Sequence, residues 1–170
     1  MHIQDLETPA IVVDLDVMES NIRSMAEYCR SHGFGLRPHT KTHKIPAIAR
    51  MQVDAGSQGI TVAKPGEAEV MADAGLDDIL VHYPVLGDSK LGRLAALARE
   101  RKIILALDSA VTAEAVSRAV ARAGSTIHIL IEFDSGMRRC GVATPDLAEA
   151  LAPPLEIMRT PRTIQFSHHP

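Results

Sequence analysis

A short basic stretch, from Leu36 to Lys44, carries the residues of this chain that are best suited to chemistry. Its sequence, LRPHTKTHK, places two lysines, two histidines and an arginine within nine positions. If the stretch is extended, side chains alternate between faces, and those that share one face are Arg37, His39, Lys41 and His43. Crowded cations with little water disfavour protonation, which predicts a lysine with a lowered pKa. A neutral lysine amine is the group that forms a Schiff base with an aldehyde.

The same stretch also fits a solvated loop. Pro46 is placed to open the next helix, and polar residues commonly precede such a proline. A second lysine, Lys64, also follows an apolar run, but Ile60 and Val62 share its face, which favours packing of its aliphatic stem. Spacing alone leaves the loop and the reactive-lysine interpretations open.

The elements that must position these residues alternate between strands and helices. Nearly continuous apolar runs are typical of buried parallel strands, and they occur at Gly59–Lys64, Asp78–Pro84, Lys102–Asp108 and Thr126–Asp134. Two more strands are predicted at Ala10–Asp16 and Phe34–Lys41. The clearest helix is predicted over Val111–Ala123, between Ser109 and Gly124. The pattern indicates repeated βα units and a parallel sheet.

The first helix has sequence signals at both ends. Asp16 is followed three residues later by Glu19, a capping-box pattern that predicts a helix with Asp16 as its N-cap. Gly33 is placed to end this helix in a left-handed conformation.

Two folds fit repeated βα units: an open doubly wound sheet and a (β/α)₈ barrel. No glycine-rich phosphate-binding turn follows the first predicted strand. Polar residues instead cluster where strands end, as barrels require: Lys41, His43, Lys64, His82, Tyr83, Asp108 and the segment 134–141. This distribution favours the barrel.

Composition excludes several classes of partner. The 18 basic and 21 acidic residues are spread along the chain and give a net charge of -3, which does not favour nucleic acid or an anionic membrane. No apolar run approaches the length of a membrane span, and we expect a cytoplasmic protein. Cys29 and Cys140 form no metal or redox motif and are expected to be buried thiols.

Four motifs together resemble one enzyme family. They are TPAIVVDLD, LRPHTKTHK, VAKPGEAEVMADAG and IEFDSGMRRCGV. The chain resembles, over roughly residues 6 to 152, the N-terminal half of the D-threonine aldolase and D-serine dehydratase family. That family belongs with alanine racemase to the fold type III pyridoxal phosphate (PLP) enzymes. The implied fold is an α/β structure, a partial PLP-binding (β/α)₈ TIM barrel of the alanine racemase N-terminal type.

The resemblance also implies roles for particular residues. Lys41 would carry PLP as a Schiff base, and Arg139 would contact the cofactor near its phenolic oxygen. Lys41 and His43 are candidates for proton transfer. For His39 and His43 the alternative, which we favour, is that they orient the lysine or the PLP phosphate by hydrogen bonding.

The implied activity is that of a PLP-dependent lyase acting on a small D-amino acid. An aldolase would cleave the Cα–Cβ bond of a β-hydroxy-D-amino acid, as D-threonine aldolase does. The alternatives are a D-serine dehydratase-like lyase and a non-catalytic PLP-binding protein. Enzymes of this fold type commonly complete their sites across a dimer, so a homodimer is expected.

The resemblance ends before the barrel is complete. A (β/α)₈ barrel needs about 250 residues, so residues 1–152 are expected to form a barrel truncated before its last strands. Residues 153–170 have no clear period and are expected to lie outside the fold. In the family a C-terminal pair of residues binds a divalent metal. His168 and His169 do not match that pair, so no metal ligands are predicted here.

Overall fold

The computed structural model describes the backbone of residues 2–157 and the side chains of residues 2–151. Four parallel strands form one sheet in the order β1-β2-β3-β4, which is also their order along the chain. The strands are β1 (Ile60–Val62), β2 (Asp78–Val81), β3 (Lys102–Leu107) and β4 (His128–Ile131). Each lies within an apolar run that the sequence predicted, because runs of this kind can be buried on both faces.

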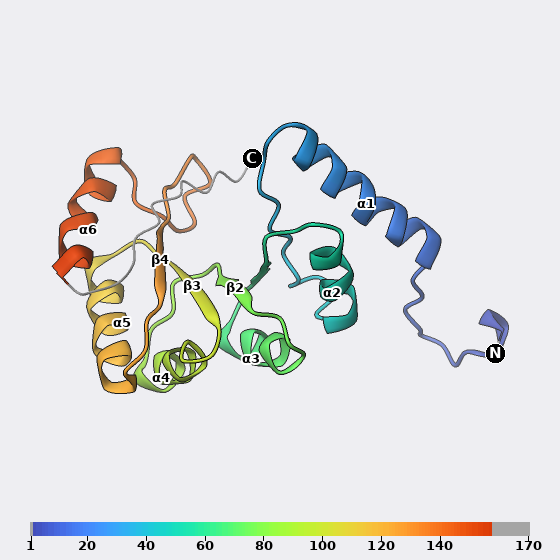
Figure 1. Ribbon diagram of the computed structural model, residues 1–170, viewed down its shortest axis with the longest axis horizontal. Coiled ribbons are helices and arrows are strands. Elements are labelled where there is room, and N and C mark those ends of the chain that lie inside the picture. The colour runs from blue at the N-terminus through green and yellow to red at the C-terminus, as the bar shows by residue number, and fades with distance from the viewer. Residues whose placement is uncertain (1, 158–170) are drawn as a thin grey trace.

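The helices of the described residues are η1 (Ile3–Asp5), α1 (Leu15–Ser31), α2 (Pro46–Asp54), α3 (Pro65–Asp73), α4 (Asp88–Leu97), α5 (Ala110–Ala123) and α6 (Pro145–Ile157). Helices α2 to α6 lie on one side of the sheet, whereas η1 and α1 lie away from it, beyond α2 (Figure 1). Figure 1 shows α2 to α6 as an arc around the strands, and each helix of this arc packs on the next or on the sheet. A doubly wound sheet would have helices on both faces. The fold is therefore part of a (β/α)₈ barrel, as predicted.

The core lies between the strands and this arc of helices. Its largest fully buried side chains include Ile60, Ile79, Leu91, Ile103 and Leu105. Local signals set the boundaries of α5: the Ser109 side chain accepts the N–H of Thr112, and Gly124 ends the helix with a φ of 62°. The Val111–Ala123 helix was thus predicted to within one residue.

The predicted strand at Ala10–Asp16 is not a strand. The segment is extended up to Asp14 but pairs with no strand among the described residues, and Ile11 is 99% exposed. The N-cap of α1 is Asp14, whose side chain accepts the N–H of Val17 at 3.1 Å. The prediction of Asp16 was wrong by two residues, because the capping-box pattern could not show which aspartate the helix uses. Gly33 does follow the helix, with a φ of 70°.

The predicted strand at Phe34–Lys41 is replaced by a looser parallel pairing. His39 forms an isolated bridge with Thr61, so this segment runs beside β1 for only a few residues. Pro38 has no N–H to donate, which limits a ladder here. From Thr40 the chain turns, and the N–H of Lys44 bonds to the Thr40 carbonyl at 2.7 Å. The predicted alternation therefore fails beyond Thr40.

Other predictions concern the ends of the chain. Helix α6 extends to Ile157, so it includes the first residues of the segment 153–170 that was expected to lie outside the fold. Residues 158–170, with His168 and His169, lie outside the described residues. None of the helices in the described part is long and apolar enough to cross a membrane.

Candidate functional site

The candidate site lies at the C-terminal edge of the sheet. His82 follows β2, Asp108 follows β3 and Glu132 follows β4. The turn after Thr40 is attached to the same edge, because the N–H and the hydroxyl of Thr40 both bond to the carbonyl of Thr61 in β1. Parallel strands end together, so four segments far apart in the sequence bring polar side chains to one place.

Lys41 stands at the tip of this turn. Thr40 is buried beneath it, whereas Lys41 itself is exposed. Its N–H donates to Nδ1 of His39 at 3.3 Å. Among the described residues the Lys41 ammonium makes no ion pair, in contrast to its neighbour Lys44. The turn thus presents one amine without a carboxylate partner.

Lys44 is held by a buried carboxylate on α3. Its Nζ lies 3.1 Å from Oε1 of Glu67, while Oε2 of Glu67 accepts the N–H of Ala63 at 2.8 Å. Although burial opposes it, these partners hold the pKa of Glu67 below its usual value. Lys44 has a φ of 54°, an uncommon conformation for a residue with a side chain. Glu67 therefore joins the turn to the start of α3.

His39 is half-buried between charged groups. Burial, together with the nearby charges of Lys41 and His82, lowers the pKa of His39 to about 4. The imidazole is therefore neutral at neutral pH. Since its Nδ1 accepts the N–H of Lys41, the ring orients the backbone that carries the lysine.

His43 is also half-buried, and burial lowers its pKa. Its Nδ1 accepts the N–H of Ile45 at 3.0 Å, just before α2 begins. This hydrogen bond fixes the exit of the turn. This contact fits the orienting role expected of His43, and its role in proton transfer stays a prediction.

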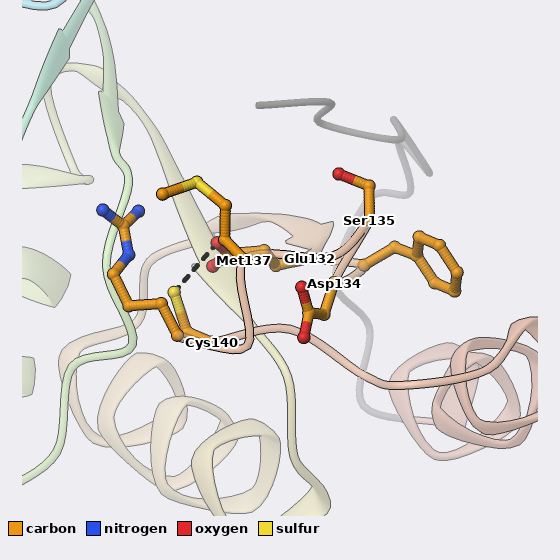
Figure 2. Close-up of a pocket in the computed structure, with 7 residues that line it drawn as sticks. Glu132, Asp134, Ser135, Met137 and Cys140 are labelled. Carbon is orange, nitrogen blue, oxygen red and sulfur yellow. Dashed lines mark hydrogen bonds between the residues drawn. The ribbon is translucent and has the colours of Figure 1, made fainter. Parts of the chain in front are cut away.

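A buried carboxylate occupies the end of β4. The side chain of Glu132 is 5% exposed, and its Oε1 lies 3.9 Å from Nε2 of His82. The same oxygen accepts the thiol hydrogen of Cys140 at 3.0 Å, the contact drawn as a dashed line in Figure 2. Among the described residues, Oε2 of Glu132 is buried and has no hydrogen-bond partner.

Arg139 lies on the loop that follows β4. Its guanidinium is beside the Cys140 thiol, and Cys140, Glu132 and Tyr83 raise its pKa. The loop is folded on Asp134, whose Oδ1 accepts the N–H groups of Gly136 and Arg138 at 2.9 and 3.0 Å. Arg139 and the carboxylate of Glu132 line one small pocket in this loop together with Phe133, Asp134, Ser135, Met137 and Cys140.

The same loop is closed at Gly141. Its N–H donates to Oδ2 of Asp108 at 3.0 Å, which ties the loop to the end of β3. Gly141 has a φ of 103°, and a Cβ at this position would lie 2.6 Å from the nitrogen of Asp134. Only glycine fits here, so Gly141 fixes where Cys140 and Arg139 are placed.

Six polar residues gather along the strand ends, and we call this set the strand-end row. It consists of Lys41, His39, His82, Glu132, Cys140 and Arg139. The row joins Lys41 and Arg139, two residues that the sequence selected and that lie 98 positions apart.

Arg37 does not join this row, contrary to the expectation that it shares a face with Lys41. Its Nη1 lies 2.8 Å from Oδ1 of Asp78, the first residue of β2, at the opposite edge of the sheet. Lys102, the first residue of β3, contacts the same carboxylate at 2.8 Å. Lys64 is exposed, at the N-cap of α3.

Sequence reasoning missed two carboxylates and misjudged one thiol. Neither Glu67 nor Glu132 was selected as a site residue, and Glu132 was counted within the predicted strand Thr126–Asp134. The available signal was the position of Glu132, an acidic residue directly after four buried or half-buried strand residues. Cys140 was expected to be simply buried, but it is half-buried and hydrogen-bonded to Glu132.

The side chains present here fit an aldehyde cofactor that also carries an acidic oxygen. An unpaired amine can condense with an aldehyde, and a guanidinium can hold a phenolate charge. At this edge of the sheet, Oε2 of Glu132 is a buried hydrogen-bond acceptor for which the described residues supply no donor. Within residues 2–151 no group of three or more His, Cys, Asp and Glu side chains could hold a metal ion.

Comparison with known proteins gives consistent matches. Residues 13–169 match the model of the alanine racemase N-terminal domain. A D-threonine aldolase from Arthrobacter is 42% identical over 147 residues, which cover 86% of this chain and 39% of that protein.

Solved structures agree. The crystal structure of D-threonine aldolase from Filomicrobium marinum matches with a TM-score of 0.91 at 38% identity, over 94% of this chain and 44% of that one. D-threo-3-hydroxyaspartate dehydratase from Delftia matches with a TM-score of 0.83 at 34% identity, over 92% of this chain and 42% of that one. This chain therefore spans about two fifths of the length of the relatives that it matches.

Proposed function

Since this chain belongs to the alanine racemase N-terminal domain family, we propose that it is the lysine-bearing part of a PLP-dependent lyase that acts on β-hydroxy-D-amino acids. The favoured reaction is the aldolase reaction, in which the Cα–Cβ bond of the substrate breaks. The similarity to D-threonine aldolases and the shared motifs support this choice. The proposed activity is that of the whole protein.

One structural observation carries the proposal: Lys41 and Arg139 both belong to the strand-end row. The resemblance assigned both residues to one cofactor, Lys41 to its aldehyde group and Arg139 to its phenolic oxygen, and the fold brings both to the same edge of the sheet. Their placement at one edge of the sheet supports a single ligand that both residues contact.

Each residue of the site then has a defined task. PLP, when bound, supplies an electron sink for the charge that develops at the substrate Cα. Lys41 would hold it through the amine, and Arg139 would hold the negative charge of its phenolic oxygen. Neutral His39 keeps the Lys41 backbone in place and adds no positive charge beside the amine. His43 fixes the end of the turn.

The first test locates the cofactor. In the whole protein, we expect visible absorbance of bound PLP, which Lys41→Ala abolishes and Lys64→Ala preserves. Borohydride reduction followed by peptide mapping should place the label on the peptide that contains Lys41. Lys64 is the matched control, because it is also an exposed lysine at the end of a strand segment. A label on Lys64, or on neither lysine, contradicts the proposal.

A dehydratase-like reaction is the second candidate, because the Delftia dehydratase structure is nearly as similar as the aldolase. The products distinguish the two. We expect D-threonine to give glycine and acetaldehyde; release of ammonia from D-threonine or D-serine would instead show a dehydratase. Both assays should be run with a chelator and with added divalent metal, since the family resemblance also implies a metal. Binding of PLP without either product would leave a non-catalytic PLP-binding protein.

The remaining expectations from the sequence stay proposals. They are a homodimer, a cytoplasmic location and partners that include neither nucleic acid nor membrane.

A further inference from the structure

Glu132 is the feature of the site that the proposed function does not use. Its carboxylate is buried at the end of β4, and Oε2 has no hydrogen-bond partner among the described residues. A buried carboxylate that no cation or hydrogen-bond donor compensates costs several kcal/mol, on the order of the penalty for any unpaired buried charge. The surroundings of Glu132 should therefore contain the reason for its presence.

The Cys140 thiol connects Glu132 with Arg139. Its hydrogen goes to Oε1 of Glu132, so the sulfur lone pairs remain free to face the guanidinium of Arg139. Burial and the bond to Glu132 raise the pKa of Cys140, which keeps the thiol protonated as this arrangement requires. The charge of Glu132 also attracts the guanidinium directly.

Arg139 needs such a partner. It is exposed and follows Arg138, which has a positive φ of 52° on the same loop. When an exposed arginine next to another cation turns toward water, its side chain gains conformational entropy and the repulsion between the two positive charges decreases. Only an anion on the sheet side of the loop opposes that movement.

We propose that Glu132 is a positioning residue: through the Cys140 thiol and by direct attraction, its carboxylate holds the Arg139 guanidinium over the strand ends, where the phenolic oxygen of the cofactor would lie. This inference rests on the proposed function, because it assigns Glu132 a role in the same site.

The first experiment uses the whole protein without cofactor, so that it tests the contact itself. In a Cys29→Ser background, which removes the other cysteine of this chain, the pH dependence of iodoacetamide alkylation is followed on the peptide that contains Cys140. Because Glu132 raises the pKa of Cys140 and Arg139 lowers it, every protein in this experiment also carries Arg139→Gln. In that background Glu132→Gln keeps the shape and removes the charge, and should move the midpoint to lower pH by about half to one unit. Glu114→Gln, an exposed carboxylate on α5, is the matched control and should move nothing. An unchanged midpoint in Glu132→Gln overturns the proposal.

The second experiment follows bound PLP. If Arg139 leaves the phenolic oxygen in Glu132→Gln, the negative charge there loses its partner, and the pH midpoint of the visible absorbance rises by about half to one unit. Loss of a nearby anion without movement of Arg139 would instead lower the midpoint. A rise therefore supports the proposal, whereas a fall or no change overturns it.

Two further variants keep this result interpretable. Glu132→Asp retains the charge and should return the midpoint toward the wild-type value. Cys140→Ala removes the thiol between Glu132 and Arg139 and leaves the carboxylate in place. It should also raise the midpoint of the visible absorbance, and it replaces Glu132→Gln as the test if that variant does not fold. If wild-type protein carries no PLP on Lys41, the proposed function fails and this inference with it. If wild-type protein carries PLP and Glu132→Gln behaves like it, only this inference fails.

Discussion

At the scale of single residues, the turn that carries Lys41 depends on Glu67. This carboxylate is 7% exposed and satisfies two donors at once, the N–H of Ala63 and the ammonium of Lys44. It therefore links the end of β1 to the residue where the turn ends. The reactive amine proposed here stands three residues before that link.

Glu67→Gln should destabilise the whole protein. A glutamine carbonyl can still accept the Ala63 N–H, but its NH₂ group then faces the Lys44 ammonium, and two donors cannot pair. The expected cost is about 2 kcal/mol in the free energy of unfolding, read from urea titration. Glu69→Gln is the matched control on the same helix: its pair with Arg93 is more exposed and should cost less than about 1 kcal/mol. Equal costs for the two variants would show that Glu67 does not anchor the turn.

Residue types indicated the chemistry of the site but not its geometry. The sequence selected Lys41, His39 and Arg139 from motifs, and the fold gathers them in one row. Arg37 was misassigned because alternation along a strand predicts only which side chains share a face. It does not predict whether a side chain lies at the N-terminal or the C-terminal edge of the sheet. Its partner Asp78 lies 41 positions away, and no local pattern links the two.

At the scale of elements, the loop after β4 is held at both of its ends. The Asp134 carboxylate accepts two backbone N–H groups inside the loop, and backbone bonds between Asp134, Glu132 and Val142 close it. The N–H groups of Gly136 and Arg138, which bond to the Asp134 carboxylate, lower its pKa. The loop is therefore a defined structure that places Arg139 and Cys140.

Gly141→Ala should disrupt this loop. The added Cβ would meet backbone atoms of Phe133 and Asp134, which cannot move without breaking the closing bonds. We expect a loss of about 3 kcal/mol or more in unfolding free energy and of PLP binding with it. Gly136→Ala is the control, because Gly136 also has a positive φ but open space around it. Its cost should stay near about 1 kcal/mol, and a comparable loss in both variants would mean that crowding at Gly141 is unimportant.

Element boundaries were predictable at some ends and not at others. Ser109 and Gly124 bound α5 as expected, and the neighbouring Asp108 does not compete as a cap, because its carboxylate accepts the N–H of Gly141. The start of α1 was not predictable, since Asp14 and Asp16 are both suitable caps. The strand at Ala10–Asp16 failed for another reason: an apolar β-branched run becomes a strand only when a partner pairs with it, and the described residues offer none.

At the scale of the whole molecule, helices α2 to α6 form one layer outside a sheet of four strands. The barrel could be recognised from the sequence because polar residues recur at strand ends. The number of barrel strands in this chain could not be predicted, because sequence periodicity identifies each βα unit separately and does not show how many units close the barrel. The chain spans about two fifths of its matched relatives, and Val12 and Val13 before α1 are 55% and 46% exposed. These side chains are apolar surface that a complete protein has reason to cover.

The strand order of this sheet has a consequence for biosynthesis. Each strand pairs with the one translated just before it: Ile60 with Ile79, Asp78 with Lys102 and Ile104 with His128. Every new pairing closes a span of 19 to 24 residues, so the entropy lost in closure stays small at each step. A nascent chain can accordingly add one unit after another as it leaves the ribosome, each docking on an edge that already exists. Synthesis and assembly then proceed in the same direction, and Lys41 is in place before Arg139 has been made.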